Sequence, residues 1–99
     1  MSVRIAIDEK ALAAFCRRYH IRKLSLFGSV LRDDFGPESD VDVLVEFEPD
    51  YIPGLVFFAM EGELSEILGY QVNLNTINFL SPYIRDTVLA EAELQYVQR

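Results

Sequence analysis

The 99-residue chain contains no tryptophan, one cysteine, one histidine and few basic residues. Its single cysteine, Cys16, cannot form an internal disulfide, so the fold is expected to suit a reducing compartment. The 9 Lys and Arg residues are outnumbered by 16 Asp and Glu residues, which gives a formal net charge of −7. That charge argues against binding polynucleotide along its phosphates. It favours metal ions, a basic partner or simply solubility.

Long apolar runs are also missing. The longest extends from Leu55 to Met60, far short of the ~20 residues that span a bilayer. The N-terminal ten residues contain no long apolar stretch either, so we predict no signal peptide, no membrane association and a cytoplasmic location. No CxxC pair, HExxH motif or P-loop pattern occurs in the chain.

The residues that are present predict one globular domain over 1–99, since 51% are hydrophobic and 25% are charged. Periodicity, capping residues and Gly or Pro punctuation predict helices over 8–19, 54–68 and 81–92, a short helical segment over 30–33, and strands over 23–27, 41–47, 71–75 and 94–97. This order indicates an α/β (α+β) fold, with a small mixed sheet of about four strands flanked by helices.

The helix expected over 54–68 begins with a segment that is apolar nearly all round. Such a segment is either buried on two sides or part of an interface. We expect most of it to lie in the core. The alternative is a partner surface formed by Tyr51, Ile52 and one of Phe57 or Phe58.

The informative motif lies in residues 27–48. Gly28-Ser29 is followed by the ten residues 30–39 and then by Asp40-Val41-Asp42. Gly28 permits a sharp strand-to-helix turn, and the N–H groups there, with the Ser29 hydroxyl, suit phosphate oxygens. Asp40 and Asp42 are two apart on a predicted strand, so both carboxylates point the same way and suit Mg²⁺. Gly-Ser alone is usually a turn, and Asp-x-Asp alone a solvated strand end; their combination on adjacent strands is more specific.

The motif resembles that of the minimal nucleotidyltransferases of the DNA polymerase beta-like superfamily: Gly-Ser, ten residues, then Asp-x-Asp. The resemblance implies that Gly28 and Ser29 cradle the triphosphate of ATP, that Arg32 assists them, and that Asp40 and Asp42 are catalytic and bind Mg²⁺. Members of this size resemble antitoxins that transfer AMP from ATP to a tyrosine hydroxyl of a HEPN ribonuclease toxin. A hetero-oligomer with that toxin is therefore expected, without direct binding of nucleic acid.

The sequence departs from the family pattern at Asn73, where a third catalytic carboxylate is expected. An amide carries no charge and cannot act as a general base, so transfer is expected to be slowed. A weakened enzyme, a binding-only relative and an engineered residue remain alternatives. A further alternative is that solvent or a toxin group removes the tyrosine proton.

A second function class is an antitoxin that masks a basic toxin surface by binding, with little or no chemistry. Asn73 and the acidic net charge motivate this alternative, and restoring the carboxylate distinguishes it from the enzyme. A nucleotidyltransferase acting on small molecules ranks lower, because the acceptor would need a second domain.

Overall fold

A computed structural model describes residues 5–33 and 35–98 of the chain. The elements follow in the order α1 (Glu9–Arg18), β1 (Ile21–Phe27), the 3₁₀-helix η1 (Gly28–Leu31), β2 (Val41–Phe47), α2 (Val56–Leu68), β3 (Val72–Asn75), the 3₁₀-helix η2 (Ile77–Phe79), α3 (Pro82–Glu91) and β4 (Glu93–Val97). This order confirms the predicted α+β fold. Residues 1–4 and 99, at the ends of the predicted domain, lie outside the described residues.

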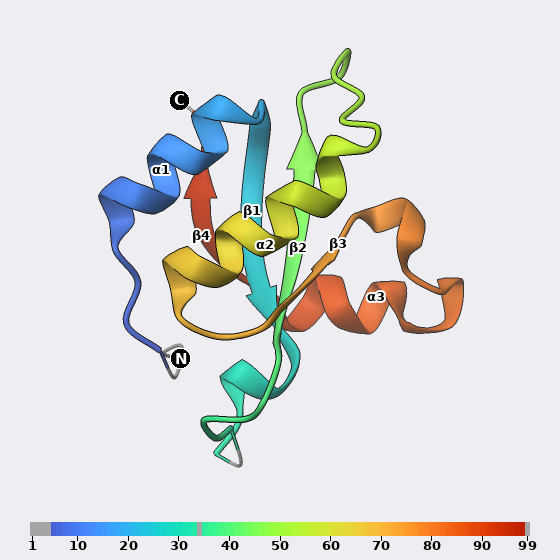
Figure 1. The fold of residues 1–99 in the computed structure, drawn as a ribbon. Coiled ribbons are helices and arrows are strands. Elements are labelled where there is room, and N and C mark those ends of the chain that lie inside the picture. Colours follow the sequence, from blue (N-terminus) through green and yellow to red (C-terminus); the bar gives the residue numbers. More distant parts are fainter. Residues whose placement is uncertain (1–4, 34, 99) are drawn as a thin grey trace.

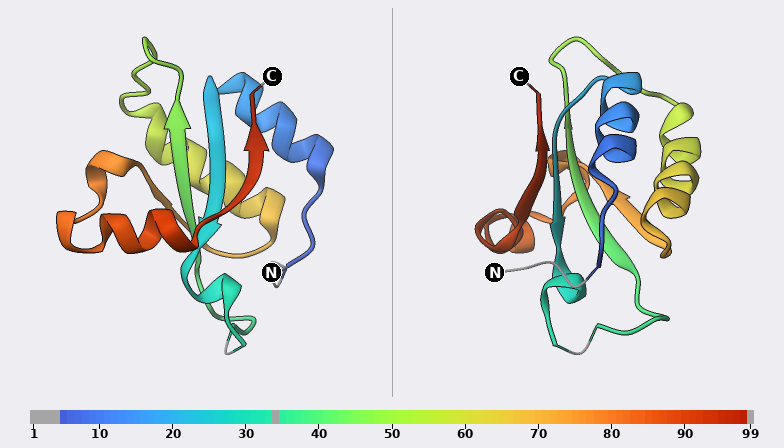
Figure 2. Two further views of the ribbon diagram at one scale, coloured as in Figure 1. Left: turned by 180° about the vertical axis from the view of Figure 1, so that it is seen from behind. Right: turned by 90° about the vertical axis from the view of Figure 1, so that its left-hand side faces the viewer.

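The four strands form one mixed sheet in the order β3-β2-β1-β4. Strand β1 is antiparallel to both β2 and β4, whereas β2 and β3 are parallel. Helices α1 and α2 cover one face of the sheet, and α3 lies on the other face (Figures 1 and 2). Strand β4 lies at one edge of the sheet.

Each of the helices α1, α2 and α3 begins or ends at a capping residue that its local sequence predicts. The Asp8 side chain caps α1 by accepting from the N–H groups of Lys10 and Ala11, both at 3.1 Å. Gly69 ends α2 in the left-handed conformation, with φ of 78°. Ser81 caps α3 by accepting from an amide of its first turn.

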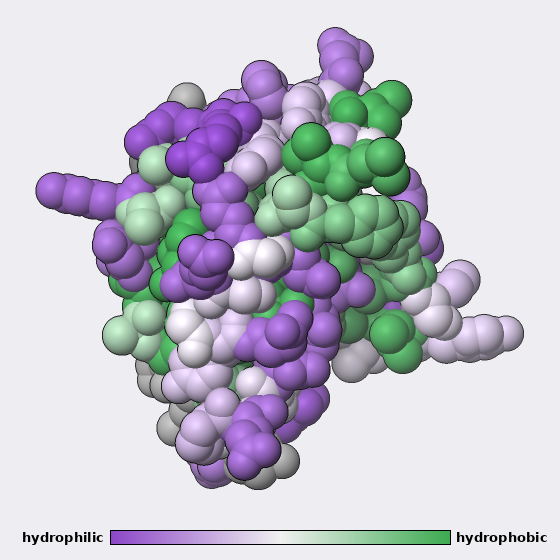
Figure 3. Space-filling model, in the orientation of Figure 1, coloured by the Kyte–Doolittle hydropathy of each residue, from purple (hydrophilic) through white to green (hydrophobic). Residues whose placement is uncertain are grey.

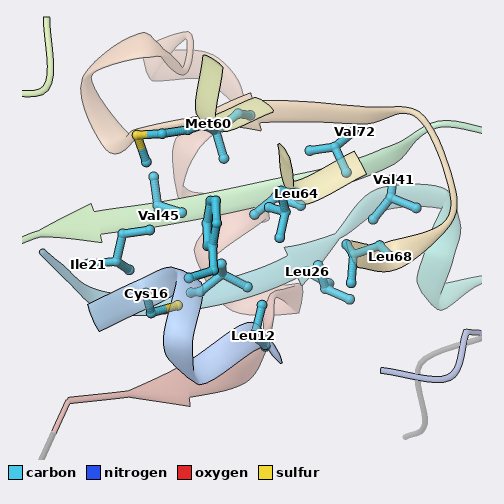
Figure 4. Packing of buried hydrophobic residues seen from close by; sticks show 14 of the residues in the cluster. Leu12, Cys16, Ile21, Leu26, Val41, Val45, Met60, Leu64, Leu68 and Val72 are labelled. Carbon is cyan, nitrogen blue, oxygen red and sulfur yellow. The ribbon is translucent and has the colours of Figure 1, made fainter. Parts of the chain in front are cut away.

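The main core lies between the sheet and the pair α1–α2 (Figure 4). Its members are apolar side chains of both helices and of the covered sheet face, and ten are labelled in the figure: Leu12, Cys16, Ile21, Leu26, Val41, Val45, Met60, Leu64, Leu68 and Val72. A second, smaller cluster of Phe27, Leu44, Leu80 and Val88 packs α3 against the opposite face. The end of α3 is thereby held beside the end of β1 (Figure 1).

The prediction that most of residues 55–60 would be buried is wrong. Met60 is fully buried, but Leu55 is 85% and Phe58 is 73% exposed. A helix on a sheet buries only one stripe, so an all-apolar first turn must leave side chains in water. The space-filling view shows this hydrophobic surface over the β2–α2 loop and the first turn of α2 (Figure 3). Within the described part of the chain, no helix is long and apolar enough to cross a membrane.

Candidate functional site

The predicted site residues meet at the end of the sheet where β1 finishes and β2 begins. Phe27, the last residue of β1, pairs with Asp42 on β2, and Asp42 pairs in parallel register with Asn73 on β3. Gly28 and Ser29 follow Phe27 directly. The topology therefore brings the Gly-Ser turn, the Asp-x-Asp segment and the third predicted position together.

The two aspartates converge on one point, as their spacing predicts. The amide nitrogen Nδ2 of Asn73 donates to Oδ2 of Asp40 and to Oδ1 of Asp42, each at 3.3 Å. Asp40 precedes the first residue of β2, yet its carboxylate still reaches the same amide. Two carboxylates that share one donor form a site with concentrated negative charge.

The electrostatics of Asp42 favour a positive ligand. Burial raises the pKa of the half-buried Asp42 above its ordinary value, and the hydrogen bond from Asn73 opposes this shift. The neighbouring Asp40 charge raises the pKa further. Burial and a like charge both disfavour the anion. A cation between the carboxylates would relieve both effects.

Helix α2 holds the strand that carries Asn73. The N–H of Val72 donates to Oγ of Ser65 at 3.0 Å, and the N–H of Leu74 donates to Oε2 of Glu61 at 2.8 Å. These α2 side chains satisfy two amides of an edge strand that would otherwise lack partners. The position of Asn73 relative to β2 is thus fixed from both sides of its strand.

Gly28 makes the closest approach in the site. Its φ is +78°, and a Cβ atom built there would overlap the Oδ2 atom of Asp42. The sequence predicted a glycine that lets the backbone approach a ligand. The structure places the Asp42 carboxylate against it, so glycine is required by both conformation and space.

We predict that Gly28→Ala weakens nucleotide binding because it displaces the Asp42 carboxylate. The added methyl group would force the carboxylate away and strain the turn, since side chains disfavour positive φ. Calorimetric titration with Mg–ATP should show an affinity at least roughly tenfold weaker. Gly36→Ala is the matched control, because a Cβ there meets nothing within 4 Å. Unchanged binding by the Gly28 variant would contradict this role.

The other two predicted phosphate ligands differ in their surroundings. The Ser29 hydroxyl donates to the main-chain carbonyl of Asp40 at 3.3 Å, which ties the turn to the start of β2. The Arg32 guanidinium is mostly exposed and forms an ion pair with Glu91 at 3.5 Å. Its partner is therefore on α3, the helix that ends at Glu91.

Glu91 is the site residue that sequence reasoning missed. Its carboxylate accepts the Gly28 N–H at 3.1 Å as well as the Arg32 guanidinium. The contact with Gly28 spans 63 positions of the sequence, and the contact with Arg32 spans 59 positions. No motif spacing predicts either contact. One signal was present, since an acidic residue in the last turn of a helix opposes the helix dipole.

The single cysteine and the single histidine lie away from this site. Cys16 is fully buried in the main core, and burial raises the pKa of its thiol to about 12. His20 is exposed and follows α1, with its ring stacked on Tyr51 at 4.5 Å between ring centroids.

The residues at the site fit one divalent cation better than two. Carboxylate oxygens suit Mg²⁺, and Asp40 and Asp42 both reach one point. Within residues 5–33 and 35–98, no group of three or more His, Cys, Asp or Glu side chains is arranged as a metal site. Rotation of the Asn73 amide would turn its carbonyl oxygen toward a bound cation, but would add no charge.

Known proteins resemble this chain in sequence and in fold. A model of the nucleotidyltransferase domain matches residues 8–94. The chain is similar to the protein adenylyltransferase MntA of Thermococcus cleftensis, with 40% identity over 75 residues, 75% of this chain and 74% of that protein. A structure described as a candidate minimal nucleotidyltransferase aligns with a TM-score of 0.70, at 32% identity and covering 86% of each chain. A toxin–antitoxin crystal structure with AMP-PNP shares the fold at 18% identity, with a TM-score of 0.74, covering 94% of this chain and 76% of that one.

Proposed function

The chain belongs to the nucleotidyltransferase domain family, and we propose that it transfers AMP from Mg–ATP to a tyrosine hydroxyl of a HEPN ribonuclease toxin and thereby neutralises it. The observation that carries this proposal is the convergence of Asp40 and Asp42 beside the Gly28-Ser29 turn. The relative from Thermococcus cleftensis, which is named a protein adenylyltransferase, supports the reaction class.

In this proposal, the Gly-Ser turn binds the triphosphate. The Ser29 hydroxyl already points toward the start of β2, and it can donate to a phosphate oxygen instead. Arg32 is exposed and supplies positive charge for the same group. The substrate would then lie over the sheet end that carries the two aspartates.

Asp40 and Asp42 would hold Mg²⁺. When bound, the ion neutralises charge on the phosphates and polarises the phosphoryl oxygen that takes up charge in the transition state. The Asn73 amide donates to both carboxylates and so fixes their orientation toward one point. Their anionic form is the one that binds a cation, so protonation of Asp42 would oppose binding.

The transfer step is an in-line displacement. The tyrosine oxygen forms a bond to the α-phosphorus, the bond from that phosphorus to the bridging oxygen breaks, and pyrophosphate leaves with the electron pair. Asn73 cannot take the phenolic proton. The proton passes to solvent or to a group on the toxin, which makes this step slower than with a positioned base.

A second candidate function is toxin masking by binding without chemistry. The neutral Asn73 at the third predicted carboxylate position favours it, as does the acidic net charge of −7. A masking protein would bind its partner with or without nucleotide.

The partner would dock on the exposed apolar surface of Ile52, Leu55 and Phe58, which are 87%, 85% and 73% exposed. We predict that Ile52→Asp with Phe58→Asp weakens binding to the toxin at least roughly tenfold. Biolayer interferometry measures this, with Leu89→Asp on α3 as control, since Leu89 is a half-exposed apolar residue on the opposite face. An equal loss of toxin affinity in the double variant and in the Leu89→Asp control would show that the interface lies elsewhere.

The intact mass of a HEPN-type ribonuclease toxin, measured after incubation with this protein, tests the proposed function. We expect AMP-sized mass increments after incubation with this protein, ATP and Mg²⁺, and none when EDTA is added. No increment together with a stable complex in gel filtration would overturn the transfer reaction and support masking.

A further inference from the structure

Glu91 lies at the end of α3, outside every motif used above, and contacts two parts of the predicted nucleotide site. Its Oε1 accepts the Gly28 N–H at 3.1 Å, and its Oε2 accepts the Arg32 guanidinium at 3.5 Å. A single carboxylate thus spans the segment that begins at the Gly-Ser turn and ends at the arginine.

The placement of Glu91 is unfavourable for the helix alone. It is the last residue of α3, and no basic residue lies in that turn. A negative charge there faces the negative end of the helix dipole. The Gly28 N–H and the Arg32 guanidinium, both outside α3, compensate for this unfavourable charge. The presence of a carboxylate at this position is therefore explained by its contacts with these two donors.

The rest of α3 makes this contact rigid. Val88, one turn earlier, packs in the small cluster with Phe27 and Leu44 on the sheet face opposite α1 and α2. Phe27 is also the residue directly before Gly28. The same packing therefore fixes both ends of the Glu91–Gly28 hydrogen bond, and the end of α3 lies beside the end of β1 in both views (Figures 1 and 2).

Gly28 needs such a support. Its N–H is part-buried, and leaving a buried donor unpaired is costly. Its positive φ and its contact with the Asp42 carboxylate leave little freedom for the turn to adjust. Without Glu91 the turn would shift, and Arg32 would lose the partner that holds it near the site.

We propose that Glu91 is a positioning residue for the triphosphate: it holds the Gly28 turn and Arg32 in place from α3 without itself contacting the nucleotide. This inference rests on the proposed function, in that the turn and Arg32 bind phosphate. It assigns to α3 a role in substrate binding that the motif residues do not contain.

Two measurements on the whole chain test it, and the first needs no nucleotide. By NMR hydrogen exchange, Glu91→Ala should expose the Gly28 amide and leave the β2 amides protected. Glu91→Gln keeps one acceptor oxygen and should preserve most of the protection. Glu46→Gln is the matched control, since Glu46 forms a surface ion pair with Arg22 at 2.8 Å. An unchanged Gly28 amide in the Ala variant would overturn the proposal.

The second measurement is the affinity for Mg–ATP by calorimetry. Glu91→Ala should weaken it by roughly 10- to 100-fold, as is typical for loss of a supporting contact, and Glu91→Gln by less. In a protein that already carries Arg32→Ala, the further change Glu91→Gln should have little additional effect on Mg–ATP affinity. The contact that Gln loses is the one to Arg32, which is already absent. Tighter binding by the Ala variant would overturn the proposal, since Glu91 would then oppose the triphosphate.

The two readouts separate this inference from the proposed function. If the unaltered protein binds no Mg–ATP, the proposed function fails, and Gly28 exchange in the Glu91 variants still decides whether Glu91 holds the turn.

Discussion

Asn73→Asp is expected to accelerate AMP transfer to the toxin by about 10²- to 10⁴-fold, the usual contribution of a general base. The introduced carboxylate would stand where the Asn73 amide now meets both Asp40 and Asp42. It would supply a proton acceptor for the tyrosine and a third anionic ligand for metal. The rate is measured by intact mass over time at saturating ATP.

Asn75→Asp is the matched control for this gain. Asn75 is two residues further along β3, so the same change is made on the same strand and the same face. A comparable gain in the control would indicate a general effect of charge. If Asn73→Asp reacts no faster than the unaltered protein, the amide is not what limits transfer, and solvent or a toxin group removes the proton.

Asp40→Asn combined with Asp42→Asn is expected to abolish transfer, with a loss of roughly 10³-fold or more, because a metal ion contributes several kcal/mol to such reactions. Both substitutions keep the size of the side chain and remove only charge. Glu46→Gln on the same strand should retain full activity, because Glu46 pairs with Arg22 away from the site. Undiminished transfer by the double variant would overturn the proposed mechanism.

The stability of Asp42→Asn should change in the opposite direction from its activity. Burial raises the pKa of Asp42 in the folded protein, so the charged form destabilises the fold at neutral pH. In EDTA at pH 7, the variant should therefore melt at a higher temperature than the unaltered protein. This advantage should shrink as the pH falls and Asp42 takes up a proton. A variant that melts lower at pH 7 would contradict the unfavourable burial of this charge.

Elements with local signals follow from the amino-acid sequence alone. The alternation of valines predicts β2 over 41–47, where the structure has it. The three helix ends are set by Asp8, Gly69 and Ser81, because capping depends on neighbouring backbone groups. The family motif is local as well, and it predicts that the two aspartates and the Gly-Ser turn belong to one site.

The exposure of the first turn of α2 depends on how the helix packs against the sheet. Residues 55–60 are all apolar, so their pattern contains no polar face that would tell which side meets the sheet. The packing of one stripe buries Met60 and leaves Phe58 in water. Periodicity has no information where every position is hydrophobic.

The electrostatics of the site also belong to the tertiary structure. Glu91 contacts Gly28, which lies 63 positions earlier in the chain. The two residues meet only because α3 packs against the end of β1. The raised pKa of Asp42 likewise depends on burial and on charges from other segments. Local patterns specify which groups a segment carries, whereas their energies depend on neighbours that only the folded chain supplies.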